Sequence, residues 1–138
     1  MLVGYQGVQG SYSEVAVIRY FAGLEYQERQ YSGFAPMMED IASGKIDYAV
    51  FPVENTTTGL ISRTYDLFQH YDIHVVGEIN VPIHHHLIGL PEAQLEDIRE
   101  AYSHPEALSQ CQEFFDANPQ IRPVAYEDTA LAVRFIAG

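Results

Sequence analysis

The sequence predicts an α/β fold made of two small lobes, each with a mainly parallel sheet flanked by helices. Strand-like and helix-like segments alternate along the first half of the chain, a pattern typical of parallel sheets covered by helices on both faces. Near residue 80 the alternation stops and a long extended segment follows. We therefore expect a first lobe at residues 1–79 and a second lobe at residues 80–138.

The composition supports a folded domain and argues against some partners. The chain has 138 residues, 47% of them hydrophobic, which is enough to bury a core. Its formal net charge is −12, from 19 acidic and 7 basic residues. Such a surface repels phosphate backbones and anionic lipids, so we expect neither nucleic acid nor a membrane as a partner.

Cysteine usage and the N-terminus indicate the compartment. Cys111 is the single cysteine, so no intrachain disulfide can form, which fits a reducing environment. The first residues carry no basic and apolar leader, and no stretch approaches the roughly 20 apolar residues of a membrane span. The sequence therefore predicts a soluble, cytoplasmic protein.

The first expected strand, residues 2–5, leads into a glycine-bounded loop. Ser11 and Glu14 have the capping-box spacing that begins a helix. Gly7 and Gly10 let the backbone approach a ligand, and the helix start directs N–H groups the same way. The loop is thus either an anion-binding turn or an ordinary connection between strand and helix.

Three further strands are expected in the first lobe. A strand at residues 26–31 precedes a helix that Ser32 caps and that ends with Gly44 just beyond it. A strand at residues 48–53 follows, and another at residues 72–76 completes a four-stranded parallel sheet.

The densest polar cluster comes directly after the strand at residues 48–53. It reads Glu54-Asn55-Thr56-Thr57-Thr58-Gly59, and we expect a helix with Leu60 and Ile61 in it to begin there. Open α/β sheets bind ligands at the carboxyl ends of their strands, and a helix start attracts anions. An ordinary helix cap with extra threonines is the alternative. We favour half of a small-molecule site.

The second lobe should contain another helix start. A strand at residues 100–103 leads into a helix that Ser103 caps and that runs through Phe115. Gln110 lies two helical turns after Ser103, so both can face one side. A strand at residues 121–125 and a helix capped by Asp128 or Thr129 end the chain. Together, the three helix starts suggest a cleft between the lobes for a ligand with carboxylates.

Two tempting motifs have simpler interpretations. His84-His85-His86 suggests a metal, but on a strand at most two of the three share a face, and no zinc-type spacing follows. Cys111 lacks a neighbouring base, so we interpret it and His104 as packing residues.

Several of these motifs, in this order, resemble the prephenate dehydratase family. The resemblance runs from end to end of the chain. The matching segments are Gly4-Tyr-Gln-Gly-Val-Gln-Gly-Ser-Tyr-Ser13, Pro52-Val-Glu-Asn-Thr56 with Gly59, Thr64-x-Asp66-Leu67, Gly77-Glu78, Pro82-Ile-His84, Ser103-His-Pro-x-Ala-Leu-x-Gln-Cys111 and Thr129-Ala-x-Ala132.

The resemblance implies two α/β lobes similar to those of type II periplasmic binding proteins. It also implies conversion of prephenate to phenylpyruvate, in phenylalanine biosynthesis, without cofactor or metal. The implied catalytic residues are Asn55, Thr56 and Gln110, and the implied substrate-binding residues are Glu54, Gly10, Ser11, Thr57 and Ser103.

The sequence departs from the family pattern in two ways. Ser11-Tyr12 replaces Thr-Phe and Thr56 replaces Ser, which keeps the chemistry. The family's Thr-Arg-Phe motif, whose threonine is the expected proton donor, and its ACT regulatory domain are absent. We therefore expect an N-terminal portion of such an enzyme, with an incomplete second lobe and impaired activity.

Two alternatives stay open: an arogenate dehydratase, and a non-catalytic module that binds a carboxylated aromatic ligand. The incomplete lobe should expose a sheet edge, which predicts a homodimer or a strand-exchanged oligomer.

Overall fold

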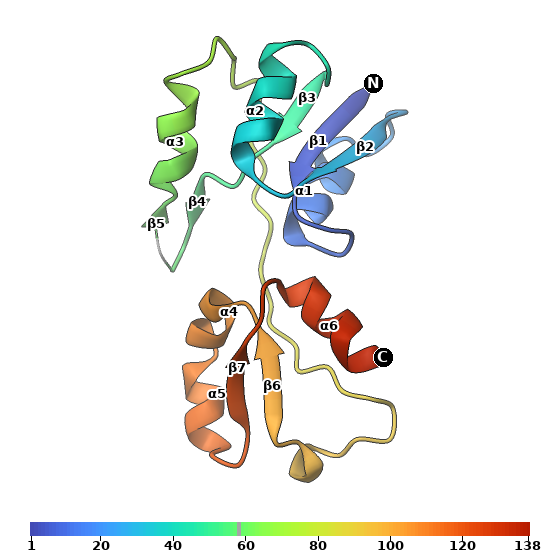
Figure 1. The fold of residues 1–138 in the computed structure, drawn as a ribbon, viewed down its shortest axis with the longest axis vertical. Coiled ribbons are helices and arrows are strands. Elements are labelled where there is room, and N and C mark those ends of the chain that lie inside the picture. The colour runs from blue at the N-terminus through green and yellow to red at the C-terminus, as the bar shows by residue number, and fades with distance from the viewer. Residues whose placement is uncertain (58) are drawn as a thin grey trace. The chain divides into compact units, whose positions relative to one another are not determined.

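The computed structural model describes residues 1–57 and 59–138 and divides the chain into two compact units (Figure 1). They are Met1–Pro82 and Ile83–Gly138. The sequence suggested a division between residues 79 and 80, and the exact limit of the lobes stays a prediction. Within the described residues, no helix is long and apolar enough to cross a membrane.

The first unit is built on a parallel three-stranded sheet. Strand β1 (Leu2–Gln6) lies in the centre, between β2 (Gln27–Tyr31) and β3 (Tyr48–Val50). Helix α1 (Tyr12–Tyr20) connects β1 to β2, and α2 (Phe34–Ala42) connects β2 to β3. The predicted parallel α/β arrangement is confirmed for these elements.

The side chains of β1 alternate between two helix-covered faces. Val3 and Tyr5 are fully buried and pack with Val17 and Phe21, at the end of α1, in one hydrophobic cluster. A Cβ on Gly4 would instead meet Met37 of α2 and two other side chains. The two helices therefore cover opposite faces, as strand alternation requires.

The helix caps agree with the sequence in part. The Oγ of Ser11 accepts a hydrogen bond from the Glu14 N–H at 3.4 Å, as the capping box predicts. Gly44 has φ +72° just beyond α2, which confirms its C′ position. The cap predicted at Ser32 is wrong, because α2 begins one residue later, after Gly33.

The segment after β3 differs from the prediction. Glu54–Asn55 (β4) and Gly59–Leu60 (β5) form a short antiparallel pair, and α3 begins only at Ser62 and ends at Phe68. The buried Thr64 hydroxyl donates to the Pro52 carbonyl at 2.8 Å, which fixes α3 against the start of this hairpin. Leu60 and Ile61 are therefore not helical, and Thr58 lies outside the described residues.

The fourth strand predicted for the first unit is also wrong. Residues 72–76 lie outside any strand that the described part of the chain forms, so the sheet has three strands. The side chains of Val75 and Val76 are 73% and 69% exposed, so these apolar residues are not buried against a sheet.

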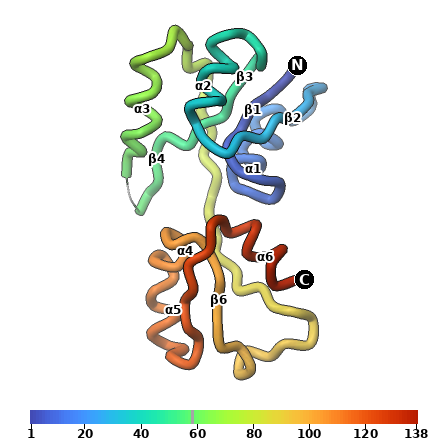
Figure 2. The backbone as a smooth tube through the Cα atoms, viewed as in Figure 1, coloured from blue at the N-terminus to red at the C-terminus, as the bar shows by residue number. Residues whose placement is uncertain are grey.

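The second unit contains a parallel pair of strands, β6 (Glu100–Ser103) and β7 (Arg122–Ala125), both confirmed within one residue. Helices α4 (Pro105–Gln110) and α5 (Gln112–Ala117) lie on one side and α6 (Thr129–Ala137) on the other, as Figure 1 shows. A single turn of 3₁₀ helix, η1, spans Leu95–Asp97. The backbone trace in Figure 2 shows the extended segment that precedes η1, which the sequence had assigned to a strand.

The helix predicted through Phe115 is divided at Cys111, which ends α4 and precedes α5. The N-cap of α4 is His104, whose Nδ1 accepts a hydrogen bond from the Glu106 N–H at 3.1 Å. The prediction that Ser103 caps this helix is therefore wrong, and so is the packing role predicted for His104. Asp128 caps α6 as expected, because its Oδ1 accepts from the N–H groups of Ala130 and Leu131.

Gly4→Ala should destabilise the first unit by about 1–3 kcal/mol, because overpacking a filled core forces its neighbours apart. The added Cβ would lie 2.6 Å from Ile46 Cδ1 and 2.9 Å from Tyr31 Cε2. Urea unfolding followed by circular dichroism measures the loss. Gly89→Ala is the control, since it lies outside any helix or strand and its Cβ would make only an ordinary contact, 3.4 Å from the Ala93 Cβ; an equal loss in both variants would contradict this account.

Candidate functional site

The loop after β1 is held in place by hydrogen bonds from three directions. Gly7 donates its N–H to the Tyr31 carbonyl at 2.9 Å, and Ser11 donates to Val8 at 3.1 Å. The N–H of Gly10, which the sequence assigns to the substrate, donates to Glu14 Oε2 at 2.6 Å. Gly7 and Gly10 have φ +118° and +92°, a conformation that glycine adopts without strain. The loop is therefore ordered by hydrogen bonds to β2, to α1 and within itself.

A buried tyrosine hydroxyl lies beneath this loop. Tyr5, on β1, donates to Glu14 Oε1 at 3.4 Å and accepts from Gln30 Nε2 at 3.1 Å. Burial, and then the nearby carboxylates, raise the pKa of Tyr5 to about 12. Burial and the Glu14 charge also raise the pKa of Glu28. Sequence reasoning missed this group, although side-chain alternation along the strand is a signal that could have indicated the burial of Tyr5.

The polar cluster after β3 lies on a hairpin rather than at a helix start. Asn55 Oδ1 accepts from the Thr57 N–H at 2.8 Å, a turn that asparagine commonly forms with the backbone two residues on. Asn55 is half-buried, while Glu54, Thr56 and Thr57 are exposed. The carbonyl end of the Asn55 amide is thus engaged, and its two N–H donors lie at the opposite end of the group.

The helix start that the sequence predicted directly after this cluster is wrong. The N-cap of α3 is Ile61, an apolar residue with no side-chain acceptor, and the cluster at Glu54–Asn55 precedes it by a complete hairpin. Any ligand of this cluster would meet discrete side-chain donors instead of a row of free helix N–H groups.

In the second unit, two hydroxyls meet at the carboxyl end of β6. Ser103 Oγ and Thr129 Oγ1 are 3.0 Å apart, and either can be the donor. The Tyr126 N–H donates to the Ser103 carbonyl at 2.8 Å and fixes the chain between β7 and α6. Thr129 was recognised in the sequence only as a possible helix cap and as part of a helix motif, because its partner is distant along the chain.

Gln110 has different partners from Ser103, although the sequence placed both on one side of a helix. Its Oε1 lies 2.7 Å from His85 Nε2, and its Nε2 donates to Glu106 Oε1 at 3.4 Å. His85 belongs to the histidine triplet that the sequence suggested as a weak metal motif. Among the described residues, no group of three His, Cys, Asp or Glu side chains could hold a metal ion.

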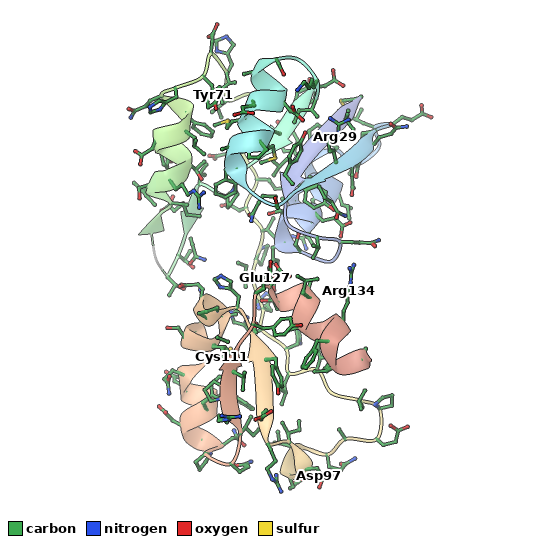
Figure 3. The ribbon with its side chains drawn as sticks, in the orientation of Figure 1. Arg29, Tyr71, Asp97, Cys111, Glu127 and Arg134 are labelled. Atoms are coloured by element: carbon green, nitrogen blue, oxygen red, sulfur yellow. The ribbon has the colours of Figure 1, made fainter. Side chains whose placement is uncertain are left out.

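Cys111 lies between α4 and α5, where Figure 3 labels it. It is half-buried, and this burial raises the pKa of its thiol. A raised thiol pKa lowers the fraction of thiolate, which is the reactive form. The result agrees with its interpretation as a packing residue.

Comparison of the sequence with family profiles and with curated proteins gives one consistent result. The profile of the family described as prephenate dehydratase matches residues 3–138. The bifunctional chorismate mutase/prephenate dehydratase of Escherichia coli K12 is 35% identical over 98% of this chain and 36% of its own length. Arogenate dehydratase 3 of Arabidopsis thaliana is 39% identical over 98% of this chain and 32% of its own.

A solved structure has the same fold. The prephenate dehydratase of Arthrobacter aurescens, crystallised with L-Phe, superimposes with a TM-score of 0.89 at 24% identity, over 100% of this chain and 46% of that one. This likeness bears on the fold alone and confirms the predicted fold class, similar to periplasmic-binding-protein lobes. The chain spans about a third of the length of the curated relatives it matches.

Tyr5 should make stability depend on pH in the alkaline range. Its pKa in the fold, about 12, lies above the ordinary value of 10, so its stabilisation is complete below pH 10 and is lost as the pH rises to 12. Between pH 10 and pH 12 the free energy of unfolding of Tyr5→Phe should therefore fall by about 2 kcal/mol less than that of the unsubstituted chain. Urea unfolding at a series of pH values measures this. Tyr65→Phe, an exposed ring, should follow the unsubstituted chain, and identical profiles for all three proteins would refute the assignment.

Proposed function

The chain belongs to the prephenate dehydratase family, and on this premise we propose that it takes part in the decarboxylating dehydration of prephenate to phenylpyruvate. The reaction would serve L-phenylalanine biosynthesis and need no cofactor. The observation that carries the proposal is the family match over residues 3–138, which includes every polar group described above. The chain spans about a third of the length of its relatives, so the activity proposed is that of the whole protein to which it corresponds.

The reaction explains why neutral donors suit this chain. Prephenate carries two carboxylates: the ring carboxylate leaves as carbon dioxide, the ring hydroxyl takes one proton and leaves as water, and the ring becomes aromatic. The pyruvyl carboxylate remains and must be held throughout. Amide and hydroxyl donors bind a carboxylate without adding charge, which matters on a surface with net charge −12.

We assign these donors as the sequence suggested. Asn55 would donate its free amide N–H groups to a substrate oxygen, while Thr57 holds its carbonyl end. Thr56 and Gln110 complete the proposed catalytic set. Substrate binding is assigned to Glu54, Gly10, Ser11, Thr57 and Ser103. The acid that protonates the leaving hydroxyl is not assigned to any of them.

Arogenate is the second candidate substrate, favoured by the 39% identity to an arogenate dehydratase. It carries an amino group where prephenate carries a keto oxygen, so the two reactions share their chemistry at the ring. Specificity would then depend on contacts with the side chain alone.

The complete product of the gene that encodes this chain should convert prephenate to phenylpyruvate in a steady-state ultraviolet assay. Arogenate assayed in parallel, with phenylalanine as the product, separates the two substrates. Absence of turnover with both would contradict the proposal, and binding without turnover would indicate a non-catalytic module.

Asn55→Asp is the sharpest test of the hairpin. Aspartate keeps the acceptor for the Thr57 N–H but replaces the amide donors with a carboxylate that repels the substrate. We expect kcat/KM to fall by about a hundredfold, or about 2.7 kcal/mol, and to fall further than in Asn55→Ala. Asn80→Asp adds the same charge at an exposed asparagine and should have little effect. Equal activity of Asn55→Asp and Asn80→Asp would remove Asn55 from the site.

We also propose that the protein is cytoplasmic and self-associates. In the part of the chain that the structure describes, β6 pairs with β7 alone, so each strand has an unpaired edge. A pair of strands is marginally stable by itself, and an unpaired edge invites another strand.

Light scattering after gel filtration should therefore show a dimer or larger species, with a mass that falls on dilution. A single monomeric mass across a wide range of concentrations would refute self-association.

A further inference from the structure

We propose that His85 is a positioning residue, which sets the orientation of the Gln110 amide so that its N–H donors face a ligand oxygen. The inference rests on the proposed function, because it assigns Gln110 to the substrate site. It begins from a three-residue chain of contacts in the second unit. His85 Nε2 lies 2.7 Å from Gln110 Oε1, and Gln110 Nε2 lies 3.4 Å from Glu106 Oε1.

Only one orientation of the amide satisfies both contacts. A carboxylate accepts hydrogen bonds and cannot donate them, so Glu106 requires the amide nitrogen on its side. The amide oxygen then faces His85, which must carry its proton on Nε2. The reversed amide would place its oxygen against the Glu106 carboxylate, with no proton between the two atoms. Glu106 therefore selects the orientation, and His85 fixes it with the shorter bond.

The pair fits a positioning role better than a purely structural one. His85 is exposed and Gln110 is half-buried, so their hydrogen bond competes with water and contributes little to folding. Glutamine has three rotatable bonds, and ordering such a side chain during binding weakens the affinity. A glutamine already held in one orientation avoids most of that cost.

The orientation also decides which chemistry Gln110 can offer. Its carbonyl is occupied by His85, so a ligand meets the amide nitrogen, which has two N–H donors and a long contact to Glu106. The remaining donor suits a carboxylate or ketone oxygen. The predicted ligand class is thus a small carboxylic or keto acid, as the proposed function requires.

Isothermal titration calorimetry of the complete gene product with prephenate and with phenylpyruvate tests the role. We expect His85→Ala to weaken binding by about fivefold to tenfold, the range that the cost of ordering one long side chain on binding gives. His85→Gln should bind within about twofold of the unsubstituted protein, because the glutamine amide nitrogen replaces imidazole Nε2 as the donor. His86→Ala is the matched control, one residue along the same exposed segment, and should also bind normally.

A double-mutant cycle separates positioning from a direct contact. In the Gln110→Ala background, His85→Ala should cause no further loss, because His85 acts through Gln110. A loss as large as in the unsubstituted background would show that His85 contacts the ligand or acts elsewhere, and would overturn the inference. Failure of His85→Gln to restore binding would overturn it as well.

Nitrogen-15 NMR of the imidazole gives a readout that needs no ligand. A proton held on His85 Nε2, with a mixture of tautomers appearing in Gln110→Ala, is the expected result; a proton held on Nδ1 alone would overturn the amide orientation. The outcomes also separate the two proposals. If the unsubstituted protein binds neither acid, the proposed function fails and takes the role of His85 with it. If it binds and His85→Ala binds equally well, only the role of His85 fails.

Discussion

The central strand β1 must be covered on both faces, and the first unit depends on this constraint. Val3 and Tyr5 require an apolar cover on one face, which Val17 and Phe21 supply. The other face is closed because Gly4 has no side chain, which allows Ile46 and Met37 to approach the backbone. Neighbouring parallel strands then end at the same edge, and the loop after β1 starts from a rigid position. The order of that loop is thus a consequence of packing beneath it.

Both units present polar groups whose orientation is fixed before any ligand arrives. Glu14 connects the Gly10 N–H to the buried Tyr5 hydroxyl, and the Thr57 N–H fixes the Asn55 carbonyl. In the second unit, Ser103 is held by Thr129. The bonds to Asn55 and Ser103 leave other donors or acceptors of these groups for a ligand, which is how a site gains preorganisation. The single Gly10 N–H, in contrast, is already donated to Glu14. A strongly acidic chain can in this way offer neutral donors at defined positions.

Local contacts were sufficient to predict some elements, although the local caps at Gly33 and His104 were missed. Strand β6 and the caps at Ser11 and Asp128 follow from residues within a few positions of one another. The hairpin after β3 could not be predicted, because Leu60 and Ile61 have the spacing of a helix face and only long-range bonds oppose it. One is the Thr64 hydroxyl to the Pro52 carbonyl, twelve residues away. His85 was missed for the same reason, since Gln110 is 25 residues beyond it.

Replacing a helix start with a hairpin changes the physics of recognition. A helix N-terminus attracts any anion through several parallel N–H groups and distinguishes poorly between orientations. The Asn55 amide, fixed by one backbone bond, has donors in a single direction and carries no net charge. Gln110, fixed by His85 and Glu106, has the same property. Uncharged donors that point in one direction distinguish ligands by the position of an oxygen atom, and not by charge alone. That selectivity would matter for the proposed substrate, which has two carboxylates, because only one of them should be held while the other departs.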